Sequence, residues 1–225
     1  MQSLIVQDCL ICRQTSEGLI CSFCRQDLNK LAFSGSDKNL MLLPKVAGGL
    51  VQVDFTILYA VCDYQWPVSN LLKGLKFSAK LPHARALAEL FVEHNMDENF
   101  VLPQAIIPIP LHNNRYLWRK YNQSSEICHH LTKLTHIPTL HQVLIRKNAT
   151  EAQTNLSAAQ RKSNLKKAFQ LSPRSQRRLN QHQHIAIFDD VTTTGATANA
   201  AYRCLKQAFP QLQIDIWSIC VTLVH

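Results

Sequence analysis

The sequence predicts an α/β protein with a mainly parallel sheet, preceded by a small four-cysteine module. From about residue 50 to the C-terminus, short apolar β-type segments alternate with segments of helical spacing. Four of the eight cysteines fall within the first 24 residues, which are too few to form an apolar core of their own. We therefore expect two units, the module with its connection over 1–49 and the α/β domain over 50–225.

The composition is that of a soluble globular protein with a substantial core, with 46% hydrophobic and 17% charged residues among 225. No apolar run approaches the roughly 18 residues of a membrane span, and no signal peptide is recognisable. We therefore expect a cytoplasmic protein without a membrane span. The 24 Lys and Arg outnumber the 15 Asp and Glu, a formal charge of +9, which favours anionic partners such as phosphates, nucleotides or nucleic acid.

The first half of the domain alternates between the two kinds of element. The stretch 51–64 is β-branched and aromatic, which is typical of a strand or a hairpin, and it follows a loose connection over 31–49. Apolar residues at helical spacing predict helices over 69–77, 83–94 and 123–136, the last capped by Ser124 or Ser125. Between them, 104–111 is expected to be a buried strand that runs into a proline-rich loop.

The second half continues the alternation. We expect a strand over 139–147, a polar surface loop over 172–184, a buried strand over 184–188, an amphipathic helix over 196–209 and a last strand over 213–224.

The stretch IAIFDDVTTTGAT, residues 185–197, carries the clearest chemical signal. In an open parallel sheet, ligands bind where strands end and helices begin. There a phosphate accepts hydrogen bonds from helix N-terminal amides and threonine hydroxyls, and a glycine lets the backbone approach closely. The adjacent carboxylates repel phosphate but accept hydrogen bonds from neighbouring sugar hydroxyls. The pattern therefore predicts a site for ribose 5-phosphate, and the plain alternative is a strand with acidic residues before an ordinary helix.

The segment DDVTTTGAT resembles the phosphoribosyl pyrophosphate (PRPP) motif of type I phosphoribosyltransferases. Four further segments, CLIC…LICSFC, LLKGLKF, IPIPLHNNRYLWRKYNQSSEI and RKNATEAQTNLSAAQRKSNLKKAF, precede it in the order seen in the ComF family. This resemblance covers nearly the whole chain and implies a type I phosphoribosyltransferase-like fold for 50–225, with PRPP and magnesium as ligands. The residues implied to bind PRPP are Asp189, Asp190, Thr192, Thr193, Thr194, Gly195, Ala196 and Thr197.

The pyrophosphate of PRPP needs cations and amides as well, and magnesium would neutralise it as a leaving group. RKYNQ is similar to the family pattern R-G-x-N-Q, with Lys120 in the place of the glycine, and 146–164 resembles the loop that closes over PRPP. For each basic residue the alternative is a solvated surface charge. The residues that we expect at the pyrophosphate are Leu111, His112, Arg115, Arg119, Arg146 and Lys76.

The cysteine spacing C-x2-C-x8-C-x2-C places two thiolate pairs in two turns, each able to hold one side of a tetrahedral metal. Four thiolates favour structural zinc, with an iron–sulfur cluster or a redox pair as the alternative. A metal-folded module of this kind offers a rigid surface to nucleic acid or to a protein. The predicted ligands are Cys9, Cys12, Cys21 and Cys24.

The resemblance implies a PRPP-binding, phosphoribosyltransferase-like protein that handles imported single-stranded DNA in the cytoplasm during natural transformation. A basic groove with stacking aromatics suits a single strand, and Tyr116, Trp118 and Tyr121 are candidates. Two alternatives stay open: an active phosphoribosyltransferase of nucleotide metabolism, and an adaptor whose zinc module docks a helicase or a recombination protein. Thr193 stands where hypoxanthine-type enzymes have an acid, which argues against that kind of salvage, and no acceptor pocket is recognisable.

Overall fold

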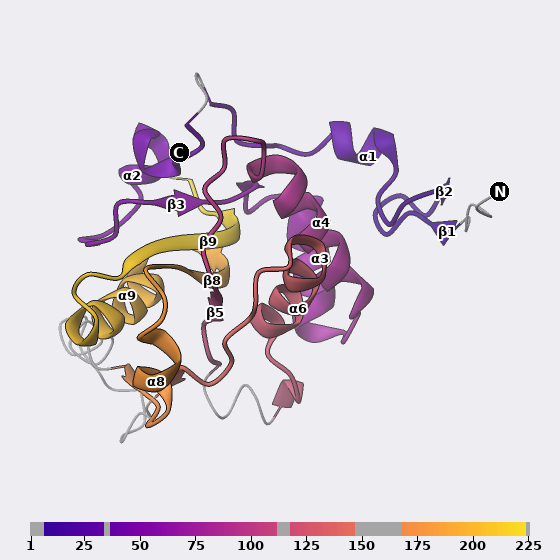
Figure 1. Ribbon diagram of the computed structural model, residues 1–225. Helices are drawn as coiled ribbons and strands as arrows, with labels where there is room; N and C mark the ends of the chain where they lie inside the picture. The colour runs from indigo at the N-terminus through magenta and orange to yellow at the C-terminus, as the bar shows by residue number, and fades with distance from the viewer. Residues whose placement is uncertain (1–6, 34–36, 112–117, 147–167, 224–225) are drawn as a thin grey trace, which may run out of the picture.

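The computed structural model describes residues 7–33, 37–111, 118–146 and 168–223 (Figure 1). The strands are β1 (Gln7–Asp8), β2 (Thr15–Ser16), β3 (Leu58–Tyr59), β4 (Cys62–Asp63), β5 (Ile106–Pro108), β6 (Leu144–Arg146), β7 (Phe169–Leu171), β8 (His184–Thr192) and β9 (Gln213–Val221). The helices are α1 (Ser22–Gln26), η1 (Leu40–Leu42), α2 (Pro44–Ala47), α3 (Val68–Phe77), α4 (Pro82–Asn95), α6 (Gln123–Thr135), α8 (Ser175–Leu179) and α9 (Ala196–Ala208).

A parallel sheet forms the centre of the molecule, in the order β3-β9-β8-β5 with β4 also paired to β9. The two long strands β8 and β9 lie in the middle. Their apolar residues are buried on both faces, since Phe188 on one face and Ile187 and Ile216 on the other are 0% exposed, as expected for strands of a parallel sheet covered by helices. The predicted α/β architecture with a mainly parallel sheet is thus confirmed.

Helices cover the two faces of this sheet with two separate apolar layers (Figure 1). On one face, α3, α4 and α6 pack against Phe188 and Trp217, whose rings lie 6.1 and 5.0 Å from that of Phe91. On the other face, α9 packs small side chains such as Ala201 against Ile187. The carboxyl ends of the strands are left between these layers, where β8 continues towards α9.

Several segments differ from the prediction, and pairing explains the most important of them. The strand expected over 184–188 continues to Thr192, because β9 supplies partners further along, with Asp189 opposite Ser218 and Thr192 opposite Val221. The hairpin considered for 51–64 is wrong, since β3 and β4 both run parallel to β9.

Three smaller corrections concern polar residues. The surface loop expected over 172–184 contains the short helix α8, anchored where the Ser175 hydroxyl donates to the Val143 carbonyl. The connection over 31–49 contains η1 and α2. Helix α6 is capped by the side chain of Asn122, which accepts from the Ser124 amide, rather than by Ser124 or Ser125.

The N-terminal segment consists of the β1–β2 ribbon and α1. Its apolar residues Leu19, Ile20 and Leu28 are buried in the same layer as α3 and α4. The segment is too short to form a core of its own, and it buries its apolar side chains against the neighbouring helices instead. No helix in the described ranges has the length and apolar character needed to cross a membrane.

Candidate functional site

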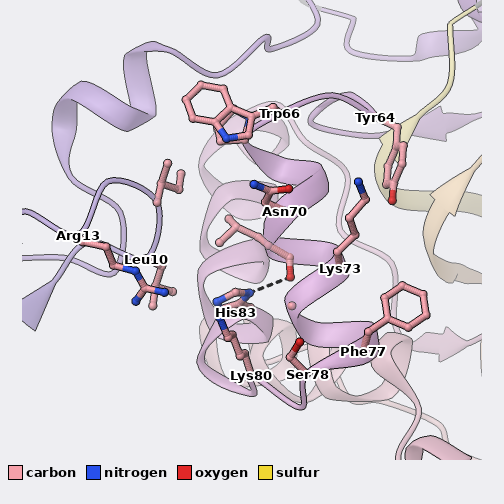
Figure 2. A pocket seen from close by; sticks show the side chains of 14 residues that line it. Leu10, Arg13, Tyr64, Trp66, Asn70, Lys73, Phe77, Ser78, Lys80 and His83 are labelled. Atoms are coloured by element: carbon pink, nitrogen blue, oxygen red, sulfur yellow. Dashed lines mark hydrogen bonds between the residues drawn. The ribbon is translucent and has the colours of Figure 1, made fainter.

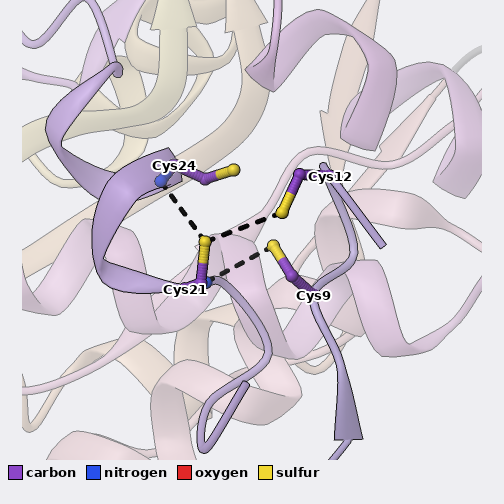
Figure 3. A group of neighbouring side chains, drawn as sticks. All are labelled: Cys9, Cys12, Cys21 and Cys24. Atoms are coloured by element: carbon purple, nitrogen blue, oxygen red, sulfur yellow. Dashed lines mark hydrogen bonds between the residues drawn. The ribbon is translucent and has the colours of Figure 1, made fainter. Parts of the chain in front are cut away.

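The four cysteines form a compact cluster on the loop after β1 and around the start of α1 (Figure 3). Their sulfurs all lie within 4.8 Å of one another, and the Cys12 and Cys21 sulfurs are 3.7 Å apart. Sulfurs at the corners of a tetrahedron with metal–sulfur bonds of about 2.3 Å would be about 3.8 Å apart. The predicted gathering of Cys9, Cys12, Cys21 and Cys24 is confirmed, and its geometry fits a four-coordinate ion.

The surroundings of the sulfurs favour thiolates at some positions. The Cys21 amide donates to the Cys9 sulfur at 3.4 Å, and the Cys24 amide donates to the Cys21 sulfur at the same distance. Burial opposes ionisation of Cys9, but the amides around it outweigh that effect and lower its pKa to about 6. Burial and the neighbouring sulfurs raise the pKa of Cys24. Such a cluster of crowded thiols is stabilised when a cation takes up the charge.

The two carboxylates lie near the carboxyl end of β8, within the strand rather than after it. Asp190 is 5% exposed and Asp189 is half-buried. The Asp189 carboxylate accepts from the Asp190 amide at 2.9 Å and from the Ser124 hydroxyl of α6 at 3.4 Å. Burial, and then the adjacent Asp190 charge, raise the pKa of Asp189 to about 8. Asp189 is therefore mainly a neutral acid at neutral pH.

Lys76 approaches the pair from α3 and forms an ion pair with the Asp190 carboxylate. The two side chains are 16% and 7% exposed, so the pair is largely removed from water. An isolated buried carboxylate is costly, and the ammonium group offsets that cost. The structure thus brings Lys76, expected at the pyrophosphate, to the carboxylates.

The threonines after the carboxylates divide into two groups. Thr192 is 3% exposed and its hydroxyl is 2.5 Å from that of Ser218 on β9, so this side chain is engaged inside the fold. Thr193 and Thr194 are exposed, and Thr197 is half-buried in the first turn of α9. The hydroxyls available to a ligand are therefore those of the three later threonines.

The turn into α9 is held by a segment from the other end of the domain. The Val51 amide donates to the Thr194 carbonyl at 3.0 Å, and the Asn199 side chain accepts from the Asp54 amide at 2.8 Å. Gly195 has φ of 74°, and a Cβ there would lie 2.7 Å from Val53 Cγ1. Glycine is required at this position both by its backbone angle and by the close approach of Val53. No side chain caps α9 at its start, so its first amides face the turn.

The other expected pyrophosphate residues are only partly described. Leu111 is half-exposed at the end of the segment after β5. Arg119 lies over the Phe77 ring at 5.0 Å and donates to the Gln123 side chain at 3.0 Å. Arg146, on β6, lies over the ring of Phe169 at 5.5 Å. These contacts place Arg119 beside the end of α3 and the start of α6, and Arg146 beside β7.

Lys120 stands where the family pattern R-G-x-N-Q has a glycine. Its φ is 63°, in the left-handed region that glycine adopts readily. The backbone thus keeps the conformation that suits the usual glycine, with a lysine in its place.

His112, Arg115 and the expected closing loop over 147–164 lie outside the described residues.

Sequence reasoning missed two contacts at the site. Ser124 was expected only as a helix cap, and Ser218 was expected only within a strand, yet their hydroxyls lie against Asp189 and Thr192. Neither serine carries a local signal, because each comes to the site through the packing of another element against β8.

Comparisons with known proteins identify relatives across most of the chain. No protein-family model matches the sequence. The DNA utilization protein YhgH of Shigella flexneri is 37% identical over 171 residues, which cover 74% of this chain and 72% of that protein. YhgH of Escherichia coli K12 is 36% identical over the same shares. Competence protein F of Haemophilus influenzae is 28% identical over 221 residues, 94% of this chain and 95% of that protein. The order of motifs, the α/β fold with its four-cysteine cluster and these relatives together show that the chain belongs to the ComF family.

Proposed function

We propose that the protein binds PRPP at the β8–α9 turn and acts on single-stranded DNA in the cytoplasm, in DNA uptake or DNA use. The observation that carries the PRPP part is the position of Asp189 and Asp190 at the carboxyl end of a central parallel strand, directly before exposed threonines and the start of α9. The proposal also takes the fold of 50–225 to be phosphoribosyltransferase-like.

The chemistry of the turn matches the two ends of a ribose 5-phosphate. The uncapped start of α9, with its partial positive charge, suits the phosphate, and Thr193 and Thr194 add hydroxyl donors. The carboxylates suit the ribose hydroxyls, which donate to them. Because Lys76 already pairs with Asp190, it is placed to exchange that contact for a pyrophosphate oxygen of the ligand.

Magnesium fits the proposal as a part of the ligand. Among the described residues, only the four cysteines bring three or more metal-ligating side chains together. Magnesium is commonly held by one or two carboxylates plus the phosphates of a substrate. It would arrive with the pyrophosphate of PRPP, touch Asp189 or Asp190 at most, and neutralise the leaving group.

The zinc and DNA parts rest on different observations. The sulfur cluster has the size and the four thiol ligands of a structural zinc site, and a closed site of that kind organises the module rather than doing chemistry. The names of the relatives, competence protein F and DNA utilization protein, support a role in competence and DNA use. The formal charge of +9 suits a polyanion.

The test is calorimetric titration of PRPP with magnesium into the zinc-loaded full chain and into Asp189→Ala/Asp190→Ala. We expect clear binding by the wild type and at least a tenfold loss in the double variant, with circular dichroism and zinc content unchanged. Asp97→Ala is a matched control, since this carboxylate is exposed and pairs with Lys38 just after α4.

Absence of PRPP binding by the wild type, or equal binding by the carboxylate variant, would refute the PRPP site. Pyrophosphate release during incubation with PRPP and candidate acceptors then separates binding from turnover. Release that depends on an acceptor would establish a transferase, and the same carboxylate variant should abolish it.

A further inference from the structure

A cleft of about 480 Å³ lies between the cysteine module and α3 (Figure 2). Leu10 and Arg13 of the module form one side and Tyr64 lies on the other. The exposed face of α3, with Asn70 and Lys73, lies between them. Neither the turn nor the PRPP proposal uses this cleft.

The charge of the cleft has a single sign. Arg13, Lys73 and Lys80 line it, and none of the described residues that line it is acidic. His83, also in the lining, is buried and donates from Nδ1 to the Leu71 carbonyl at 2.8 Å, and burial lowers its pKa. The fixed charge of the cleft is therefore positive, which favours an anionic occupant.

Exposed aromatic rings accompany these cations. Trp66 is 60% exposed and Phe77 is 59% exposed, although large aromatic side chains usually bury most of their surface. Phe77 continues the row to Trp118, whose ring centre is 6.0 Å away and which is 67% exposed. Trp66 lies just before α3 and Phe77 is its last residue, so they flank a helix about 15 Å long.

From this arrangement we propose that the α3 cleft is the single-stranded DNA site of the protein. Bases stack on Trp66 and Phe77, and backbone phosphates lie against Arg13, Lys73 and Lys80. This inference rests on the DNA part of the proposed function and names the surface that performs it. A positive groove with stacking rings is the usual means by which proteins hold single strands without regard to sequence.

The features of the cleft favour a single strand over a duplex or a protein. Rings are useful to a ligand with exposed bases, and the bases of a duplex are already stacked on one another. A docked protein segment would also be expected to meet acidic partners for its own cations, and the described lining offers none. The cysteine module then forms one wall of the cleft, and a metal bound by the cysteines would fix the position of Arg13.

The experiment is fluorescence anisotropy of labelled dT20 with the zinc-loaded full chain. Trp66→Ala/Phe77→Ala is expected to weaken binding at least tenfold, since each stacked base contributes about 1–3 kcal/mol. Lys73→Ala is expected to weaken binding severalfold and to lower the slope of log affinity against log salt by about 0.7, the value for one lost phosphate contact on a single strand. An abasic DNA strand of 20 nucleotides has the same charge as dT20 but no bases. It should bind the wild type as weakly as dT20 binds the aromatic variant.

Matched controls lie outside the cleft on the same molecule. Phe23→Ala removes a ring that is 73% exposed on α1, and Lys133→Ala removes an exposed charge on α6. Both should bind dT20 within twofold of the wild type. All substituted side chains are exposed, so the fold should persist, and Lys73→Ala tests the cleft independently of the rings.

The same variants are titrated with PRPP, which separates this inference from the PRPP proposal. Lys73→Ala should bind PRPP normally, and Asp189→Ala/Asp190→Ala should bind dT20 normally. The inference is overturned if the cleft variants bind dT20 like the wild type, if the controls lose as much affinity as they do, or if the wild type does not bind dT20. It is also overturned if a 20-base-pair duplex binds more tightly through the same residues.

Discussion

The cysteine cluster and the carboxylate turn are built in opposite ways. All four sulfurs come from residues 9–24, on two short turns that can be read from the sequence letters. The carboxylates of β8 instead meet Lys76 of α3, Ser124 of α6 and a turn held by Val51. A site of the first kind depends on a short local segment, and a site of the second kind depends on the packing of the whole fold.

The negative charges of the two sites are also neutralised in different ways. The cluster crowds four thiols that need a cation from outside, whereas the fold itself supplies an ammonium group to Asp190 and leaves Asp189 mainly protonated at neutral pH. Removing the metal should therefore damage the first site in one step. Damage to the second should be graded, according to which supporting element is changed.

The largest effect is expected from the metal. Cys9→Ser removes one thiolate and should release the zinc, because a four-sulfur site loses much of its affinity with one ligand. The module would then lose its packing against α3 and α4, and we expect the melting temperature to fall by roughly 10 °C, since about 1 kcal/mol corresponds to 2–4 °C at this size. Zinc content and differential scanning calorimetry measure both.

Cys204→Ser is the matched control, because this half-exposed cysteine of α9 lies outside the cluster. It should retain one zinc per chain and the melting temperature of the wild type. If Cys9→Ser behaved like this control, the module would not depend on its metal and the contrast between the sites would fail.

The second effect concerns the ion pair on which the carboxylate site rests. Lys76→Met leaves Asp190 buried without its cation, and breaking a buried pair in this way costs about 3–5 kcal/mol. Lys73→Met changes the same side chain three residues earlier on an exposed face and should cost less than about 0.5 kcal/mol. Urea unfolding at pH 8 measures both.

Adding Asp190→Asn to Lys76→Met should recover most of the lost stability, because the uncompensated charge is then gone. Equal stability of the two lysine variants would show that the pair does not stabilise the fold, and the carboxylates would then need no partner from α3.

The two sites also show what the sequence can and cannot reveal. Spacing alone predicted the four sulfurs, and the apolar runs predicted the sheet and most helices. The strand predicted from the apolar run ends at Phe188, before the polar Asp189 and Asp190, yet pairing with β9 continues it to Thr192. The family resemblance implies Lys76 at the pyrophosphate, and no local sequence pattern predicts its contact with Asp190.

The residues of the α3 cleft follow a regular spacing in the sequence, but the spacing alone does not identify a binding surface. Trp66, Asn70, Lys73 and Phe77 recur at intervals of four, three and four residues, which places them along one side of a helix. In the sequence this spacing reads equally well as a face turned towards the core. Only the exposure of the rings in the fold distinguishes the two.

A third effect tests how closely the turn depends on its support. Gly195→Ala must hold φ of 74° and place a Cβ 2.7 Å from Val53, and such strain costs about 1–3 kcal/mol. Stability should fall by that amount, and PRPP affinity should fall with it because Thr194 and the start of α9 shift. Adding Val53→Ala removes the collision but not the backbone strain, and it should recover part of both losses.

Gly18→Ala is the comparison in the cysteine module. A Cβ there would meet only the Ile20 carbonyl at an ordinary 3.6 Å, so we expect a change within about 0.5 kcal/mol. A harmless Gly195→Ala would mean that the turn can relax, and the support by Val51 and Val53 would lose its importance.

The smallest effect is a dependence of PRPP binding on pH. The pKa of Asp189 is raised to about 8 by burial and by Asp190, so the group is mainly protonated at pH 7 and mainly ionised at pH 9. Ribose hydroxyls donate best to the ionised form. Affinity should therefore increase about tenfold from pH 7 to pH 9 and level off above that range, whereas the phosphates of PRPP, with a pKa near 6, are already ionised.

Titrations in buffers of different ionisation enthalpy should show about one proton released per ligand at pH 7, because binding draws Asp189 into its charged form. Asp189→Asn should bind more weakly and abolish both the proton release and the increase in affinity with pH. Its amide keeps the shape of the side chain but cannot lose a proton in this range. An increase with pH that persists in Asp189→Asn would place the titrating group elsewhere, and the β8 carboxylates would then bind ribose without exchanging a proton.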